Sequence, residues 1–225
     1  MEEDLFMSIE KNTVSAKNQV INSSDLSFLG HENAKTRILV VGNSITRHGP
    51  CAEIGWNNDW GMAASAEEKD FVHRLYAKLV ENGQDVYMRI RQCADWEQNY
   101  FKEDVLSDYE EEKLFNANIV VFRLGENVTA ENQAQFQEAL KNFISCICPE
   151  TGKVIYTTCF WKHDTVDAAI KAVAAERGEL CLDGFLARDE TNMALGLFEH
   201  TGVSYHPSDK GMEMMAELIF NALKK

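Results

Sequence analysis

Residues 37–44 read RILVVGNS, a short run of aliphatic and β-branched side chains that ends in glycine, asparagine and serine. A run of this length without polar alternation is typical of a strand that is buried on both faces of a parallel sheet. The glycine and asparagine then favour a tight turn. We therefore expect the first central strand in this stretch, with Ser44 directly after it.

Similar apolar runs recur along the chain, each preceded by polar or helical sequence. Between them, apolar side chains are spaced by three and four residues, as in Phe71, Leu75 and Leu79, which predicts amphipathic helices. Alternating strands and helices with almost no hairpin signals are typical of a parallel sheet covered by helices. The sequence therefore predicts an α/β fold, a three-layer α/β/α sandwich with a five-stranded parallel sheet. The further strands are expected at 85–93, 117–125, 153–161 and 178–185.

The chain is expected to form one domain, because 225 residues with 45% hydrophobic side chains suffice for a single core. Residues 1–36 are polar and only weakly periodic, so they are interpreted as an N-terminal extension. The folded domain is then expected to span residues 37–225.

The net charge of the chain indicates which kinds of molecule it can bind. Thirty-six acidic residues against 22 basic ones give a formal net charge of -14, which disfavours nucleic acid and anionic membrane surfaces. A neutral or cationic small molecule fits better. No apolar run is long enough to cross a bilayer, and the start of the chain lacks the pattern of a secretory signal, so a cytoplasmic location is expected.

The six cysteines show no paired spacing of the kind that binds zinc. We expect them to be free thiols, several of them buried in strand-like runs. No metal and no cofactor is predicted.

Ser44 lies in Gly-Asn-Ser-Ile-Thr, directly after the first predicted strand. A sharp strand-to-helix turn exposes a hydroxyl and lets backbone N–H groups converge, as a nucleophile requires. Two other interpretations remain open: Ser44 caps the following helix, or the turn binds phosphate. Phosphate is disfavoured because no lysine follows in a Gly-Lys-Ser/Thr pattern.

Two further segments carry side chains suited to the same chemistry. Asn127, in Gly-Glu-Asn after the third predicted strand, can donate a hydrogen bond to a developing negative charge, although asparagine here also suits a turn. His206 precedes Pro207, which favours an extended loop that presents the imidazole, although a loop histidine is often only solvated. A parallel sheet brings such segments to one edge.

In order and spacing, these three segments resemble blocks of the SGNH (GDSL-like) hydrolase family. Gly-Asn-Ser-x-Thr resembles the first block, with Asn in place of the commoner Asp, Gly-Glu-Asn resembles the third, and His-Pro-Ser-Asp-x-Gly resembles the fifth. The resemblance runs from about Arg37 to the C-terminus and implies a flavodoxin-like α/β/α fold. It also implies that Ser44 is the nucleophile, that its N–H and the Asn127 side chain form an oxyanion hole, and that His206 is the base.

Two positions depart from this pattern or leave it open. The second block normally supplies a backbone donor from a glycine, and position and context suggest Ala94 for this role. The family usually has an aspartate three residues before the histidine, where this sequence has Val203. A backbone carbonyl can orient the imidazole instead, or a carboxylate can reach it from elsewhere, the candidates being Glu199, Asp209 and Glu126.

The loop after Ser44 is long and rich in tryptophan, asparagine and glycine. Trp56 and Trp60 are candidate substrate-binding residues, because two indole rings can stack on a sugar face, and Glu126 is a third candidate. The alternative is that both rings pack over the edge of the core.

The resemblance therefore predicts a carboxylic ester hydrolase that cleaves a small acyl ester, such as an acetyl ester on a carbohydrate, through an acyl-enzyme on Ser44. Two alternatives stay open. The first is a family member without turnover that binds a glycan or acylated ligand, and the second is an acyltransferase that uses the same residues.

Overall fold

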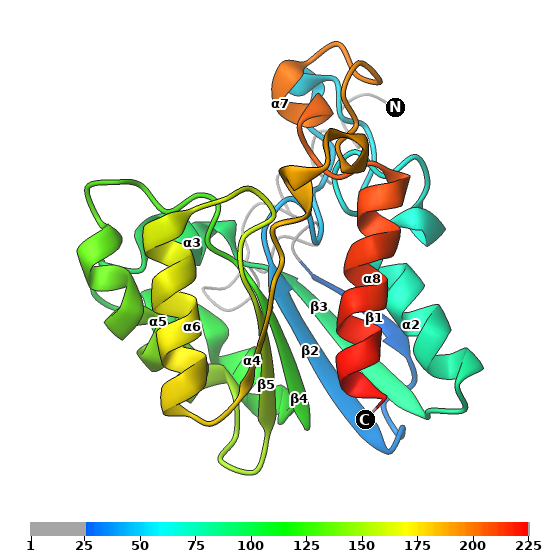
Figure 1. The fold of residues 1–225 in the computed structure, drawn as a ribbon. Coiled ribbons are helices and arrows are strands. Elements are labelled where there is room, and N and C mark those ends of the chain that lie inside the picture. Colours follow the sequence, from blue (N-terminus) through cyan, green and yellow to red (C-terminus); the bar gives the residue numbers. More distant parts are fainter. Residues whose placement is uncertain (1–25, 225) are drawn as a thin grey trace, which may run out of the picture.

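The computed structural model describes residues 26–224 and has helices on both faces of one central sheet (Figure 1). The predicted α/β/α sandwich is confirmed. The sheet has six strands in the order β1-β3-β2-β4-β5-β6, and all neighbours except β1 and β3 are parallel. Without β1, this is the flavodoxin-like strand order. The parallel strands are β2 (Thr36–Gly42), β3 (Val86–Gln92), β4 (Ile119–Arg123), β5 (Lys153–Thr157) and β6 (Leu180–Leu182).

The sixth strand corrects the predicted five-stranded parallel sheet. It is β1 (Leu26–Gly30), which forms the edge of the sheet and pairs antiparallel with β3, and Phe28 stacks on Tyr87 with ring centroids 5.4 Å apart. These residues fall in the segment predicted as an extension over 1–36, because a five-residue strand inside polar sequence gives little periodic signal. The remainder of that prediction, residues 1–25, lies outside the described residues.

The two faces of the sheet carry separate cores. Because side chains of a strand alternate between faces, Ile38 and Val40 pack against residues of α2 (Phe71–Glu81) and α8 (Asp209–Leu223). Figure 1 shows these two helices together on one face of the sheet. Leu39 and Val41 face the opposite layer. This explains why the strand reads as a continuous apolar run. The opposite layer contains α3 (Ala94–Asn99), α4 (Glu110–Phe115), α5 (Gln133–Ile147) and α6 (Asp164–Glu176).

A third, smaller apolar cluster lies above the carboxyl ends of the strands. It joins Trp56 and Met62, from the loop after β2, to Ala194 and Val203 near the C-terminal helix. Figure 1 shows the same arrangement, with α7 (Thr201–Ser204) beside the cyan loop. Two segments that are far apart in the sequence thereby cover one edge of the sheet together. The other short helices among residues 26–224 are η2 (Ala52–Ile54), η3 (Glu67–Lys69), η4 (Val105–Tyr109), η5 (Leu186–Arg188) and η6 (Glu190–Asn192).

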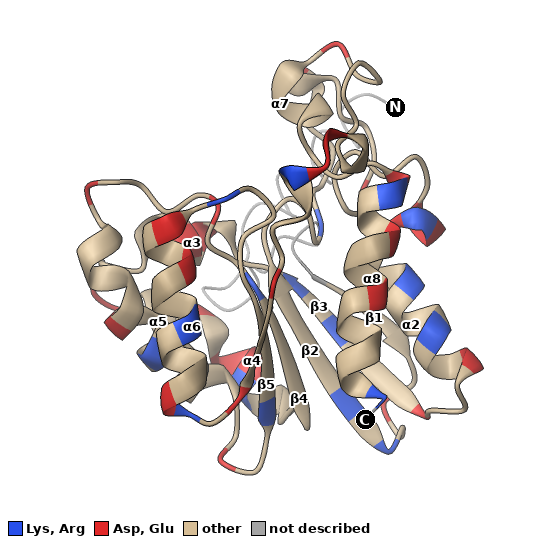
Figure 2. Ribbon diagram, viewed as in Figure 1, with Lys and Arg blue, Asp and Glu red and all other residues tan. Residues whose placement is uncertain are grey.

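Acidic and basic residues are spread over the helices of both layers (Figure 2). Within residues 26–224, no helix is long and apolar enough to span a membrane, and no cluster of three or more His, Cys, Asp or Glu side chains is arranged to hold a metal ion. All six cysteines are free thiols. Burial raises the pKa of Cys148 and of Cys181 to about 11, so these two thiols stay protonated at neutral pH.

Candidate active site

The turn after β2 presents Ser44 at the carboxyl edge of the sheet. This turn is so tight that it requires glycine at position 42, because a Cβ on Gly42 would lie 1.8 Å from the Thr46 hydroxyl oxygen. The Thr46 N–H then donates to the Asn43 carbonyl at 2.8 Å, which closes the turn. In this conformation Ser44 Oγ lies 2.8 Å from Nε2 of His206, a residue 162 positions further along the chain.

His206 is held in the loop between α7 and α8. Its carbonyl accepts from the Ala194 N–H at 2.9 Å. Two residues later the Ser208 hydroxyl caps α8 by accepting from the Gly211 N–H at 3.3 Å. Nδ1 of His206 lies 2.7 Å from the Gly202 carbonyl oxygen. The imidazole is therefore bonded on both sides.

The Gly202 carbonyl also determines which ring nitrogen of His206 carries the proton. A carbonyl oxygen only accepts, so Nδ1 of His206 must donate to it. Nε2 of a neutral ring is then left with a lone pair toward Ser44. This is the tautomer in which the histidine can remove the serine proton.

The surroundings keep this imidazole neutral. Burial is the main reason that the pKa of His206 falls to about 4, and the nearby His48 and Arg123 side chains lower it further. The Gly202 hydrogen bond and the Glu126 charge oppose the shift. His206 is thus unprotonated at neutral pH and able to act as a base.

Each carboxylate that the sequence suggests as a partner for His206 has other contacts or lies on the surface. Asp209 accepts from the Ser65 N–H at 2.8 Å and from its hydroxyl at 2.7 Å. Glu126 is bonded to Arg123 at 2.5 Å, and Glu199 is exposed. Of the arrangements suggested by the sequence, the structure contains the backbone-carbonyl one.

Asn127 lies in the loop after β4 and is bonded to Glu97, a residue that the sequence analysis did not single out. The Asn127 side-chain amide donates to Glu97 Oε2 at 2.7 Å, and its backbone N–H donates to Oε1 at 3.0 Å. Gly125 N–H donates to the same Oε1 at 2.5 Å. Glu97 is fully buried on α3 and also contacts the Asn43 amide nitrogen at 3.3 Å.

Ala94 starts α3 beside the Ser44 turn, where the N–H of the preceding Cys93 donates to the Gly42 carbonyl at 2.7 Å. The Ala94 N–H itself donates to the Gln92 side chain at 3.0 Å. A substrate oxyanion would therefore compete with the Gln92 side-chain oxygen for the Ala94 N–H, the donor that the sequence analysis predicts.

Glu126 is not exposed for contact with a substrate, which corrects one prediction. Its side chain is 5% exposed and also accepts from the Phe160 N–H at 2.8 Å and from the Asn43 amide at 2.7 Å. Although burial opposes ionisation, the Arg123 guanidinium holds the pKa of Glu126 below its usual value. Through its bonds to Asn43 and Phe160, the buried Glu126 carboxylate links the loops that follow β2, β4 and β5.

Trp56 does not offer a ring face to a substrate, which corrects a second prediction. Its side chain is 1% exposed, its indole N–H donates to the His48 carbonyl at 2.9 Å, and its ring meets Trp60 edge-on at 6.0 Å. Trp60 is partly exposed and donates to the Ala64 carbonyl at 2.9 Å. The rings pack over the edge of the core, the alternative interpretation of this loop.

A different tryptophan, Trp161, lies beside the hydrogen-bonded pair of Ser44 and His206, here called the dyad. Trp161, in the loop after β5, is partly exposed and meets the His206 ring edge-on at 5.5 Å. Trp96, also just beyond a strand, instead stacks on Phe143 at 4.2 Å inside the core.

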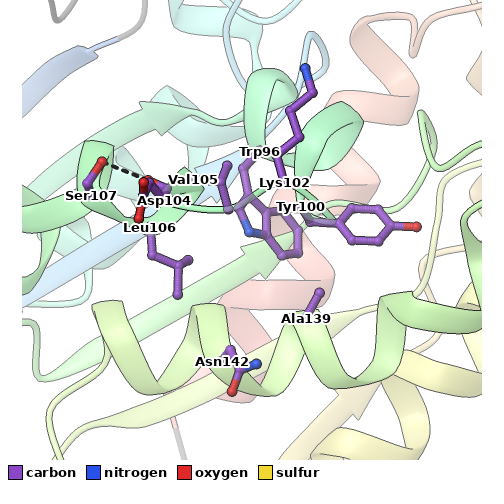
Figure 3. Close-up of a pocket in the computed structure, with 9 residues that line it drawn as sticks. All are labelled: Trp96, Tyr100, Lys102, Asp104, Val105, Leu106, Ser107, Ala139 and Asn142. Carbon is purple, nitrogen blue, oxygen red and sulfur yellow. Dashed lines mark hydrogen bonds between the residues drawn. The ribbon is translucent and has the colours of Figure 1, made fainter.

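A cavity of about 390 Å³ lies between α3, η4 and α5, and Figure 3 shows its lining side chains. Neither Ser44 nor His206 lines it, so it is separate from the dyad. The lining residues are Trp96, Tyr100, Lys102, Asp104, Val105, Leu106, Ser107, Ala139 and Asn142.

No protein-family model matches the sequence, and no curated protein matches it. Solved structures do match the fold. TesA is 19% identical, with 84% of this chain and 98% of that chain covered and a TM-score of 0.54. A lipase/acylhydrolase from Enterococcus faecalis is 18% identical, with 84% and 95% covered and a TM-score of 0.55. The acetyl xylan esterase AlAXEase is 14% identical, with 83% and 99% covered and a TM-score of 0.55. This chain therefore has the fold of the SGNH (GDSL-like) hydrolases.

Proposed function

We propose that the protein is a serine esterase that hydrolyses a small acyl ester, with Ser44 as nucleophile and His206 as general base. The observation that carries this proposal is the 2.8 Å contact between Ser44 Oγ and His206 Nε2. The Gly202 carbonyl supports it, because the hydrogen bond to Nδ1 leaves Nε2 free to accept a proton.

The reaction follows from this contact. His206 Nε2 takes the Ser44 proton while Oγ attacks the ester carbonyl, and a tetrahedral oxyanion forms. His206 returns the proton to the departing alcohol, which leaves Ser44 acylated. Water then loses a proton to the same nitrogen and attacks the acyl group, and the acid is released as Ser44 regains its proton.

We propose the Ser44 N–H, the Asn127 side chain and the Ala94 N–H as donors to the oxyanion. Loss of one such donor costs on the order of 10²–10³ in turnover. Asn127→Ala is therefore expected to lower kcat by about that factor, with a small change in KM.

For the substrate, we propose an acetyl or other small acyl ester of a carbohydrate. AlAXEase and Axe2, which share this fold with TM-scores of 0.55 and 0.52, are acetyl xylan esterases. The partly exposed Trp161 ring beside His206 is suited to contact with a sugar face. The net charge of -14 favours a neutral substrate over a polyanion.

The first test is hydrolysis of a short-chain chromogenic acetate ester by the wild type, Ser44→Ala and His206→Ala. Ser145→Ala and His31→Ala are matched controls, because both side chains are exposed. We expect both dyad variants to lose turnover while remaining folded. Equal rates in wild type and Ser44→Ala would contradict the esterase proposal and favour a binding protein. Product analysis with acceptor sugars separates hydrolysis from acyl transfer.

A further inference from the structure

We propose that Glu97 is a positioning residue, whose buried carboxylate fixes the Asn127 amide as a donor and ties it to the turn that carries Ser44. The inference rests on the proposed esterase function, in which Asn127 stabilises the oxyanion. Glu97 itself touches no reacting atom and acts through its neighbours.

The contacts of Glu97 join three separate segments. From α3, Oε1 accepts from the Gly125 and Asn127 N–H groups at 2.5 and 3.0 Å, and Oε2 accepts from the Asn127 amide at 2.7 Å. Oε2 also lies 3.3 Å from Nδ2 of Asn43, the residue next to Ser44. One carboxylate therefore links the nucleophile turn with the loop of the proposed oxyanion donor.

The hydrogen bonds at Glu97 stabilise its ionised form. The Asn43 amide cannot be flipped to offer its oxygen, because Oδ1 already accepts from the Ile45 N–H at 3.2 Å and from Arg123 at 3.3 Å. With the Asn127 amide oriented as observed, every partner of Glu97 named above is a donor, and hydrogen bonds from donors stabilise a carboxylate. Burial raises the pKa of Glu97, and the charge of Glu126 raises it further, while hydrogen bonds from Asn127 and Gly125 oppose the rise.

An ionised Glu97 imposes one orientation on Asn127. If the Asn127 amide turned over, its oxygen would face the carboxylate at the distance of a hydrogen bond and would be repelled. The amide nitrogen has two hydrogens. One is bonded to Glu97, and the other is left to donate elsewhere, as an oxyanion donor must.

A double-mutant cycle tests this coupling. Glu97→Gln keeps the shape of the side chain but places an NH2 group among N–H donors, so Asn127 loses its fixed orientation. Since misplacement of a catalytic group by about 1 Å costs on the order of 10² in rate, we expect kcat to fall by about that factor, with KM nearly unchanged. In an Asn127→Ala background, the same substitution is expected to change kcat by less than about threefold, because the group that it positions is already absent.

Glu112→Gln is the matched control, since Glu112 is another fully buried glutamate on a short helix, bonded to Arg89 at 2.8 Å. It is expected to lower the Tm and to leave kcat unchanged. Should Glu97→Gln not fold, Glu97→Asp keeps the charge and shortens the side chain, and is expected to show a smaller loss of kcat with the same dependence on Asn127.

An equal loss of kcat in both backgrounds, or no loss in either, would overturn the role of Glu97. Turnover that does not depend on Ser44 would instead overturn the esterase proposal. The two failures are therefore distinguishable in the same set of variants.

Discussion

The carbonyl oxygen of Gly202 lies 2.7 Å from Nδ1 of His206, on the nitrogen opposite the one that faces Ser44. A carboxylate there would both fix the tautomer and stabilise the imidazolium that forms during catalysis. The carbonyl fixes the tautomer but carries no net charge. The imidazole is therefore oriented as the proposed base, and its protonated form lacks the negative charge that the acid of a triad supplies.

The pH profile should show how strongly burial disfavours the charged form of His206. With the pKa of His206 at about 4, the imidazole is the free base above that pH and becomes protonated as the pH falls through it. We expect kcat/KM to stay level in mildly acidic buffer and to be half-maximal near pH 4. Circular dichroism at each pH separates this loss from unfolding. A midpoint near the ordinary histidine value of about 6.5 would contradict the account.

Restoring an aspartate at the position where the SGNH family usually has one should not improve this protein. Val203 is 1% exposed and packs in an apolar cluster with Trp56 and Ala194, so Val203→Asp would bury an unpaired charge. We expect a lower Tm and no gain in kcat, because the Gly202 carbonyl already occupies Nδ1. Val203→Ala is the control for lost packing alone. A gain in kcat in Val203→Asp would show that a carboxylate at this position reaches His206.

Trp56 and Trp161 should respond to truncation in different ways. Trp56 is buried, and removal of such a ring typically costs about 3–5 kcal/mol of unfolding free energy, so Trp56→Ala is expected to be mainly a stability variant. Trp161 lies against His206 and is partly exposed, so Trp161→Ala should lower kcat/KM with a smaller loss of stability. Urea unfolding and ester hydrolysis measure the two effects. The reverse pattern would mean that Trp56 binds the substrate.

Much of the fold could be predicted because buried parallel strands have a local signal. Both faces of β2 are covered by helices, so its side chains are apolar without alternation. The strand β1 lacks that signal, since it is a short edge strand in polar sequence.

The candidate site was only partly predictable, for a different reason. Ser44 stands out because it follows an apolar strand, and His206 because it lies just before the C-terminal helix, and each belongs to a distinctive block of residues. The burial of Trp56 depends on Ala194 and Val203, far along the chain. Glu97 meets donors 28 and 30 residues later, and nothing in its local sequence indicates that such donors surround it.

The most direct test of the central claim is covalent labelling with a fluorophosphonate, in which an activated serine oxygen attacks phosphorus and fluoride leaves. Intact-mass and peptide analysis should find one adduct on Ser44, none in Ser44→Ala, and much slower labelling in His206→Ala, since His206 Nε2 lies 2.8 Å from the attacking oxygen. Labelling at another residue, or a rate that does not depend on His206, would contradict the Ser44–His206 mechanism.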